Sequence, residues 1–234
     1  MTPATAFRCI SVSALVALGA CGFGSTAREQ VHKTVPTSAA PAVRVDNVAG
    51  SIQIDSWDKP TVDVTATKSA NDTAALRNIA IEVRTEGDGV SIATKYADGP
   101  HDGGVSYRIV VPAGASLDVR DTAGSVHIAG VRGNVTVATE AGSVTADLGK
   151  IAAGRSVDLT ATTGQVRLIA AAGSDAHVQA NTTVGSFASD FPSVVEKREN
   201  LVGSSATGNI GSGSARVRLL TTTGSIHLER GTNP

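Results

Sequence analysis

Six glycines mark a repeat that fills most of this 234-residue chain. Apolar residues recur seven and five positions before each glycine, and two and four positions after it. Of the 24 positions defined in this way, 21 are Val, Ile, Leu or Phe, whereas a hydrophobic content of 41% would place only about ten apolar residues there by chance. The six glycines are Gly50, Gly124, Gly142, Gly164, Gly185 and Gly224. The alternation on each side of the glycine predicts two short strands per repeat, each with one buried face.

The glycines predict tight corners between the paired strands, because glycine adopts backbone conformations that bulkier residues avoid. From Gly124 onward the corners are 18, 22, 21 and 39 residues apart, and Gly208 reads as a degraded copy inside the last interval. Repeats of about 20 residues predict an all-β fold, a single-stranded β-helix or β-solenoid with about six coils. A meander or sandwich of antiparallel hairpins is the alternative, but no corner carries the Asn-Gly or Asp-Gly turn that hairpins favour.

Two segments depart from the repeat. The section between Gly50 and Gly124 contains Asp72, which can cap a short helix, and two apolar runs around a Gly-Asp turn typical of a hairpin. We expect this section to cover one end of the stacked coils, where a bare sheet edge would invite aggregation. Residues 191–213 are expected to shield the other end.

The N-terminus has the features of a secretory signal. Residues 1–20 contain one charge, Arg8, and a short apolar stretch that cannot span ~30 Å of hydrocarbon as a helix. The following boundary, Leu18-Gly19-Ala20-Cys21, resembles the bacterial lipobox, in which the cysteine becomes the lipid-carrying N-terminus. This resemblance implies a lipoprotein anchored through Cys21, and the alternative is an ordinary signal peptide that leaves Cys21 as a free thiol.

These features predict four segments. Residues 1–20 are the lipoprotein signal peptide, and residues 21–41 are a lipid-anchored flexible tether, because they are rich in Pro, Ser, Thr and Gly and lack an apolar period. Residues 42–230 form the β-solenoid domain, and residues 231–234 are a short tail. The membrane is therefore an expected partner, through the N-terminal lipid.

Composition argues against several kinds of partner and site. The 20 basic and 21 acidic residues leave a net charge of −1, which argues against a nucleic-acid partner. Both cysteines lie in the first 21 residues, so a disulfide framework or a Cys-based zinc site is not available. The histidines share no local cluster, so neither a metal nor a cofactor is expected. They are His32, His101, His127, His177 and His227.

Catalysis on a polysaccharide would need clustered carboxylates near a basic group. The outward positions one and three residues after each glycine carry no carboxylate; they are Ser51, Gln53, Ser125, His127, Ser143, Thr145, Gln165, Arg167, Ser186, Ala188, Ser225 and His227. On the other outward face, Asp118 and Asp158 are expected two coils apart at about 10 Å, with Thr136 between them and Arg120 nearby. That separation is at or beyond the upper limit for an inverting carboxylate pair, so a solvated face is favoured over a catalytic pair.

Trp57, Asp58 and Lys59 form the most distinctive candidate for a surface contact, because a lone aromatic ring can stack on a sugar or anchor a partner. A ring that closes the end of the stack is the alternative. The segment 48–64 around them resembles the opening of the bacterial putative-adhesin family, with a glycine, a short strand, a Trp-Asp-basic-Pro turn and another strand. The repeated Thr-x-Gly-Ser units and the Gly-rich run 208–213 are also similar, so the resemblance covers residues 42–230.

The resemblance implies a single-stranded β-helix in the cell envelope, related to toast-rack domains linked to envelope-stress systems, and it implies no catalytic residue. Phe187 and Ser189 depart from the family's small Val/Ile pattern in the fifth repeat. We therefore expect a non-enzymatic, exported lipoprotein on the periplasmic or cell-surface face of the membrane. It would be an adhesin-like scaffold or binding module whose partner is an envelope protein or a polysaccharide. An envelope-stress sensing domain that acts through a membrane protein is the alternative, and a polysaccharide lyase or hydrolase is a third.

Overall fold

The computed structural model describes residues 12–15, 27–97, 102–197 and 203–231. Within these ranges the chain forms 18 strands and one short helix, and all the strands belong to one continuous sheet. The prediction of an all-β fold is therefore confirmed. In the described part of the chain, no helix is long and apolar enough to cross a membrane.

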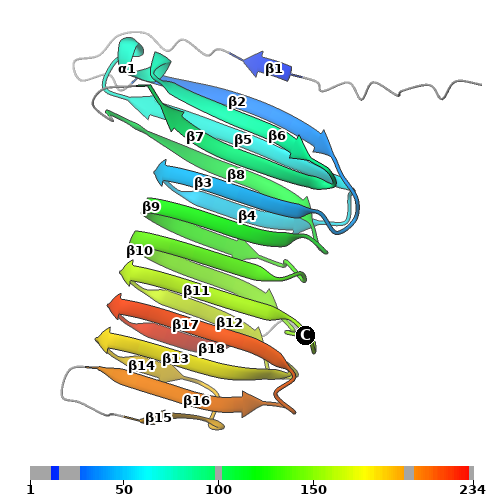
Figure 1. Cartoon of the computed structure of the whole chain (residues 1–234), viewed down its shortest axis with the longest axis vertical. Helices are drawn as coiled ribbons and strands as arrows, with labels where there is room; N and C mark the ends of the chain where they lie inside the picture. Colours follow the sequence, from blue (N-terminus) through cyan, green and yellow to red (C-terminus); the bar gives the residue numbers. More distant parts are fainter. Residues whose placement is uncertain (1–11, 16–26, 98–101, 198–202, 232–234) are drawn as a thin grey trace, which may run out of the picture.

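Each repeat unit places one strand segment before its corner glycine and one after it (Figure 1). In two units a single long strand runs through the corner: β9 (Ser116–Ala129) and β10 (Val135–Gly149). In the other units the corner separates two strands: β3 (Ala42–Ala49) from β4 (Ile52–Trp57), β11 (Ser156–Thr163) from β12 (Val166–Ala171), β13 (Ala176–Val184) from β14 (Phe187–Ser189), and β17 (Ala215–Thr223) from β18 (Ile226–Gly231).

The remaining elements lie mainly at the two ends of the stack. One end holds β2 (Ala27–Pro36), β5 (Thr61–Ala70), α1 (Thr73–Arg77), β6 (Ile79–Glu86), β7 (Gly89–Tyr96) and β8 (Gly104–Pro112), with β1 (Val12–Leu15) paired antiparallel to β2. The other end holds β15 (Val194–Lys197) and β16 (Ser204–Ile210). β6 and β7 form the expected hairpin, and Asp72 caps α1 by accepting a hydrogen bond of 2.7 Å from the Ala75 amide. Both irregular sections therefore cover the ends, as their sequences predict.

The strand segments form two outward faces. The first face, built from the segments before the corners, has the spatial order β6–β7–β3–β9–β10–β11–β17–β13–β16–β15. The second face, built from the segments after the corners, has the order β2–β5–β8–β4–β9–β10–β12–β18–β14. The repeat units pair in parallel throughout, which contradicts the alternative of a meander or sandwich of antiparallel hairpins.

The predicted inward register is correct. Of the 24 apolar template positions, 23 are buried between the two faces, and Ser189 on the three-residue edge strand β14 is half-buried. The side chains stack in ladders; for example, Ile52 pairs with Val126, and Val126 pairs with Val144. Because the side-chain period of a strand is two, this burial fixes which residues of each unit point outward.

The order of the units in the stack differs from their order in the chain. The last unit, β17–β18, lies between β11–β12 and β13–β14 and runs parallel to both. After β14 the chain adds β15 and β16 at the end and then returns to the inner position. In the same way, β7 and β8 stack outside β3 and β4, which precede them in the chain. All units share the apolar pattern. The pattern therefore determines which residues of a unit point inward, but not which other unit lies next to it.

The six corner glycines stack on one another. A Cβ atom on Gly142 would lie 1.6 Å from the carbonyl oxygen of Gly124, and one on Gly164 would lie 1.7 Å from that of Gly142. Gly142 also has a φ of 147°, a conformation that side chains disfavour. Gly208 is not a degraded corner, because it lies inside β16, where a Cβ atom would come within 2.0 Å of the Ser193 carbonyl oxygen.

The prediction of a flexible tether over residues 21–41 is wrong for residues 27–36. Residues 27–36 form β2, which pairs with β5 over ten residues. At its inward positions the strand carries Glu29, which forms an ion pair of 2.8 Å with the buried Lys68 of β5. The folded domain therefore includes β2 and does not begin at residue 42.

Candidate functional site

The second face carries a row of outward side chains that crosses six strands. The row runs in register through Gln53, His127, Thr145, Arg167, His227 and Ala188. These side chains, and the row at the first position after each glycine, are exposed or half-buried. The row contains no carboxylate, but four of the six positions two residues later along the strands are acidic: Asp55, Asp147, Glu229 and Asp190. Arg167 pairs with Glu229 at 2.5 Å, and Arg108 lies 3.9 Å from Asp55, so two of the cations on this face have carboxylate neighbours.

Asp118 and Asp158 lie on the first face on either side of Thr136, as their spacing predicts. Each carboxylate has an arginine neighbour: Arg120 lies 3.6 Å from Asp118, and Arg218 lies 3.6 Å from Asp158. Both aspartates are about one third exposed, at 38% and 34%. Ion pairs with this exposure contribute little to stability and are typical of a solvated surface.

The histidines are scattered over the molecule. His32 of β2 contacts Asp63 of β5 at 2.8 Å on the second face. His177 contacts Asn209 at 2.6 Å on the first face. His127 and His227 share a row but are separated by Thr145 and Arg167. His101 lies outside the described residues. Within the described residues, no group of three or more His, Cys, Asp or Glu side chains converges as a metal site would require.

Trp57 holds the turn between β4 and β5 together. Its indole Nε1 donates a hydrogen bond of 2.8 Å to the Thr61 carbonyl, and the Lys59 ammonium lies 4.8 Å from the ring centroid. The ring is half-buried, whereas Asp58 and Lys59 are exposed. β4 pairs with β8 on one side and β9 on the other, so Trp57 does not close an end of the stack. A ligand that stacks on this ring from the side of Lys59 would have to displace that side chain.

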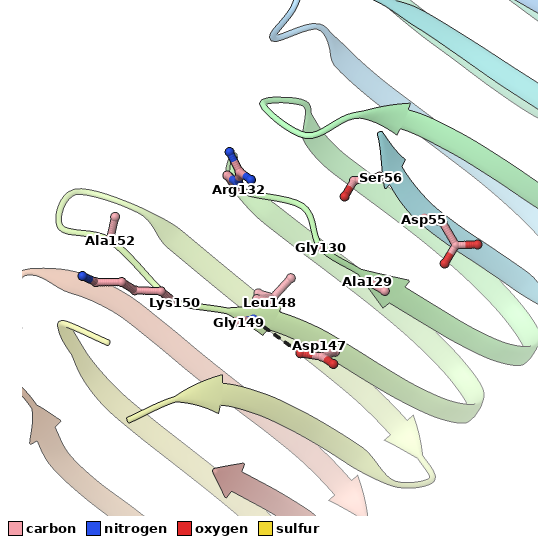
Figure 2. Close-up of a pocket in the computed structure, with 10 residues that line it drawn as sticks. All are labelled: Asp55, Ser56, Ala129, Gly130, Arg132, Asp147, Leu148, Gly149, Lys150 and Ala152. Carbon is pink, nitrogen blue, oxygen red and sulfur yellow. Dashed lines mark hydrogen bonds between the residues drawn. The ribbon is translucent and has the colours of Figure 1, made fainter. Parts of the chain in front are cut away.

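An open groove of about 660 Å³ lies where β4, β9 and β10 end (Figure 2). Its charged lining residues are Asp55, Arg132, Asp147 and Lys150, and the Gly149 amide lies 3.4 Å from an Asp147 carboxylate oxygen. Figure 2 shows that the charged ends of Arg132 and Lys150 point away from the two carboxylates. The groove therefore does not bring an acid and a base together on one reacting group.

A ladder of polar side chains lies inside the stack, three residues before the corner glycines. Sequence reasoning missed it, although the residue types gave a signal, because five of these six inward positions are polar. They are Asn47, Asp121, Thr139, Thr182 and Thr221, with Ala161 as the exception. Each of the five polar side chains is at least 95% buried.

The ladder is hydrogen-bonded where β3 meets β7 and β9. Asn47 donates to Asp121 Oδ1 at 3.1 Å and to the Val105 carbonyl at 3.2 Å, and its own oxygen accepts a bond of 2.9 Å from Thr94. Because the Thr94 hydroxyl proton is used in that bond, Tyr107 is the donor in its 2.8 Å contact with Thr94. The second oxygen of Asp121 is buried without a hydrogen-bond partner.

Burial therefore makes the charged form of Asp121 unfavourable. It raises the pKa of this carboxyl to about 6, although the hydrogen bond from Asn47 opposes the rise. In the unfolded chain an Asp titrates near pH 3.9. Between these two values the folded protein holds a proton that the unfolded chain has lost, so the contribution of Asp121 to stability falls as the pH rises from about 4 to about 6.

Asp121→Asn is expected to stabilise the protein above pH 6, because an amide fills the same volume without a buried charge. We expect a gain in unfolding free energy on the order of 2 to 3 kcal/mol at pH 7.5 and almost none at pH 4, measured by chemical denaturation across this range. Asp158→Asn on the first face is the control and should change the pH dependence little. Identical pH profiles for the wild type and Asp121→Asn would contradict this assignment.

A solved structure shares the architecture. A putative cell adhesion protein from Clostridium sporogenes has a TM-score of 0.62 and 10% sequence identity, and the match covers 88% of this chain and 100% of that chain. A putative adhesin from Bacteroides fragilis has a TM-score of 0.30 at 10% identity, with 85% of this chain and 96% of that chain covered. One from Parabacteroides distasonis has a TM-score of 0.26 at 13% identity, with 89% and 98% covered. No curated protein matches the sequence.

The sequence also matches a family model, the toastrack domain DUF4097, over residues 106–229. The match covers more than half of the chain and contains five of the six corner glycines. The resemblance to the putative-adhesin family and its toast-rack relatives is thus confirmed. Glycine-cornered units in parallel ladders, the shared architecture and the family match agree, and this chain belongs to the toastrack family DUF4097.

Proposed function

We propose that this protein is a non-enzymatic, lipid-anchored module of the bacterial cell envelope that binds an envelope protein or a polysaccharide through its outward faces. The observation that carries this proposal is the pair of long outward faces on a stack of parallel units, whose outward side chains are mostly small, polar or ion-paired. We also infer that the stacked units form a single-stranded β-helix of about six glycine-cornered coils, with the chain order rearranged near both ends.

The anchor would be a lipid on Cys21, which lies outside the described residues. The lipobox resemblance of residues 18–21 supports export and lipidation. Five residues separate Cys21 from Ala27, where β2 begins, and six extended peptide steps reach at most about 20 Å. The end of the stack that contains β2 would therefore lie next to the membrane. The opposite end, with β13 and β16, would lie about 40 Å further out, given a strand spacing near 4.8 Å.

Two features favour binding over catalysis. The carboxylates of Asp118 and Asp158 are matched by arginines instead of being poised beside a general acid or base. In the groove of Figure 2, the basic side chains diverge from Asp55 and Asp147. Binding, unlike catalysis, needs no reacting groups held in a fixed geometry. It needs only a surface that matches the ligand, and either outward face could serve as one.

The proposal predicts that the purified protein cleaves none of a panel of acidic and neutral polysaccharides, with or without calcium. Alanine at Asp118, Asp158 or His127 should leave any measured binding within a few-fold of the wild type, because each of these three side chains is only a small part of a long outward face. Reducing-end release measures turnover, and co-sedimentation measures binding. Turnover that Asp158→Ala abolishes would contradict the proposal. If deletion of the gene altered the response to cell-wall antibiotics while adhesion stayed normal, the stress-sensing alternative would replace it.

A further inference from the structure

The half of the first face that lies farthest from β2 differs in chemistry from the rest of that face. Its outward side chains come from β11, β17, β13 and β16, which are neighbours in that order. One row runs in register through Asp158, Arg218, Gln179 and Thr207. A second row runs through Ser156, Arg216, His177 and Asn209. We call the outward surface formed by Arg216, Arg218, Gln179, Asn181, Thr207 and Asn209 the far patch.

The charges on the near half of this face are balanced. Arg44 pairs with Asp46 at 2.8 Å, and both Arg44 and Arg120 approach Asp118 within 4 Å. On the edge strand β6, Arg84 pairs with Glu82 at 3.0 Å. The three arginines of the near half therefore have carboxylate partners within the protein.

The far patch lacks this balance. Asp158 is the one carboxylate on its two rows, and it is 3.6 Å from Arg218. The Arg216 side chain is exposed and makes no hydrogen bond or ion pair within the described residues, although its backbone amide donates to the Arg155 carbonyl. The patch is thus positively charged, although the chain as a whole has a net charge of −1.

Amide and hydroxyl groups surround these arginines. Gln179 and Asn181 of β13 and Thr207 of β16 line an open groove of about 460 Å³ together with Arg218. His177 links the side chains of Asn209 and Gln179 through contacts of 2.6 and 3.3 Å. Amides both donate and accept hydrogen bonds, as the hydroxyl groups of a sugar do, and a guanidinium matches a carboxylate with two parallel hydrogen bonds.

We propose that the far patch binds a carboxylate-bearing polysaccharide. Arg216, whose side chain is unpaired, and Arg218, which also lies near Asp158, would contact the carboxylates. Gln179, Asn181 and Thr207 would contact the sugar hydroxyls along the groove. The inference rests on the proposed role of the protein as an envelope binding module and names its ligand class. Because these strands lie toward the end of the stack opposite β2, the patch would lie far from the membrane, where an extended glycan chain can reach it.

The test uses the full chain as its cells produce it, purified in a nonionic detergent from whichever fraction contains it, so failure of the lipid anchor leaves the assay intact. Binding is measured at low and high salt to polygalacturonate as the carboxylated probe, with dextran as the neutral probe and single-stranded DNA as a polyanion without sugar carboxylates. We expect binding to polygalacturonate that weakens with salt, and little binding to dextran. Arg216→Glu should lower the affinity for polygalacturonate at least tenfold, and the double change of Gln179 and Asn181 to Ala should lower it several-fold.

The matched control is Arg84→Glu, which makes the same change in charge at the opposite end of the same face. It should leave the affinity within twofold of the wild type, and melting temperatures should show that all variants are folded. Equal losses for Arg84→Glu and Arg216→Glu would overturn the proposal, because the attraction would then be a property of the whole molecule. DNA binding tighter than polygalacturonate binding would overturn the ligand class. Wild-type affinity in Arg216→Glu would overturn the site.

Discussion

Val126→Asp is expected to prevent the protein from folding into a stable stack. The side chain is 1% exposed and lies in register between Ile52 and Val144. A carboxylate at this position would be surrounded by aliphatic groups and would have no hydrogen-bond donor, which costs more than about 4 kcal/mol and approaches the whole stability of a domain. Circular dichroism during thermal unfolding should show no cooperative transition, or one at a much lower temperature.

The neighbouring position supplies the control. Ser125 precedes Val126 on β9 and points outward, where it is exposed. Ser125→Asp introduces the same carboxylate into water and should change the unfolding free energy by about 0.5 kcal/mol or less. Similar melting temperatures for Ser125→Asp and Val126→Asp would show that the assignment of inward and outward residues is wrong, since a shift by one residue exchanges the two faces.

The sequence predicts this register well because the register is a local property. Each unit repeats the same alternation around a glycine, and the neighbouring glycine carbonyl excludes a side chain at each corner. The β6–β7 hairpin and the Asp72 cap of α1 were also predictable, since each depends on a few adjacent residues. Local chemistry therefore determines the strands, the corners and their burial.

The order of the units is not encoded in the same way. β17–β18 stacks between β11–β12 and β13–β14, yet its apolar pattern would fit any neighbour in the stack. β2 was missed for a different reason. Its inward positions include Glu29, whose charge is matched by Lys68 across the pair, so the apolar alternation of the strand is interrupted. A strand with a charged inward residue is hard to recognise from the sequence when the residue that pairs with that charge is distant along the chain.

The buried polar residues could not be recognised from the sequence for the same reason, because their partners are distant along the chain. Asp121 becomes a distinctive group only when the fold brings Asn47 beside it and removes water from its second oxygen. Arg155 precedes β11 in a loop without any pattern, and it is 8% exposed because it donates hydrogen bonds to the carbonyls of Val131 and Gly133. The unpaired charge of the far patch likewise arises from strands that are neighbours only in the folded stack.

Cys21→Ser is the second change for which we expect a very large effect. In the proposed envelope module, the anchor is a lipid on this one residue, so the attachment to the membrane depends on it. The substitution should move nearly all of the protein from the detergent phase to the aqueous phase, because the acyl chains supply the hydrophobic contribution of about 0.8 kcal/mol per CH₂ group. The folded domain should keep its melting temperature.

The most direct measurement of the central claim is metabolic labelling with a radioactive fatty acid in intact cells, followed by detergent phase partition. Cys9→Ser, in the predicted signal peptide, is the control. We expect label and detergent partition for the wild type and for Cys9→Ser, and neither for Cys21→Ser. Unchanged labelling and partition of Cys21→Ser would contradict the account of this protein as a lipid-anchored envelope module.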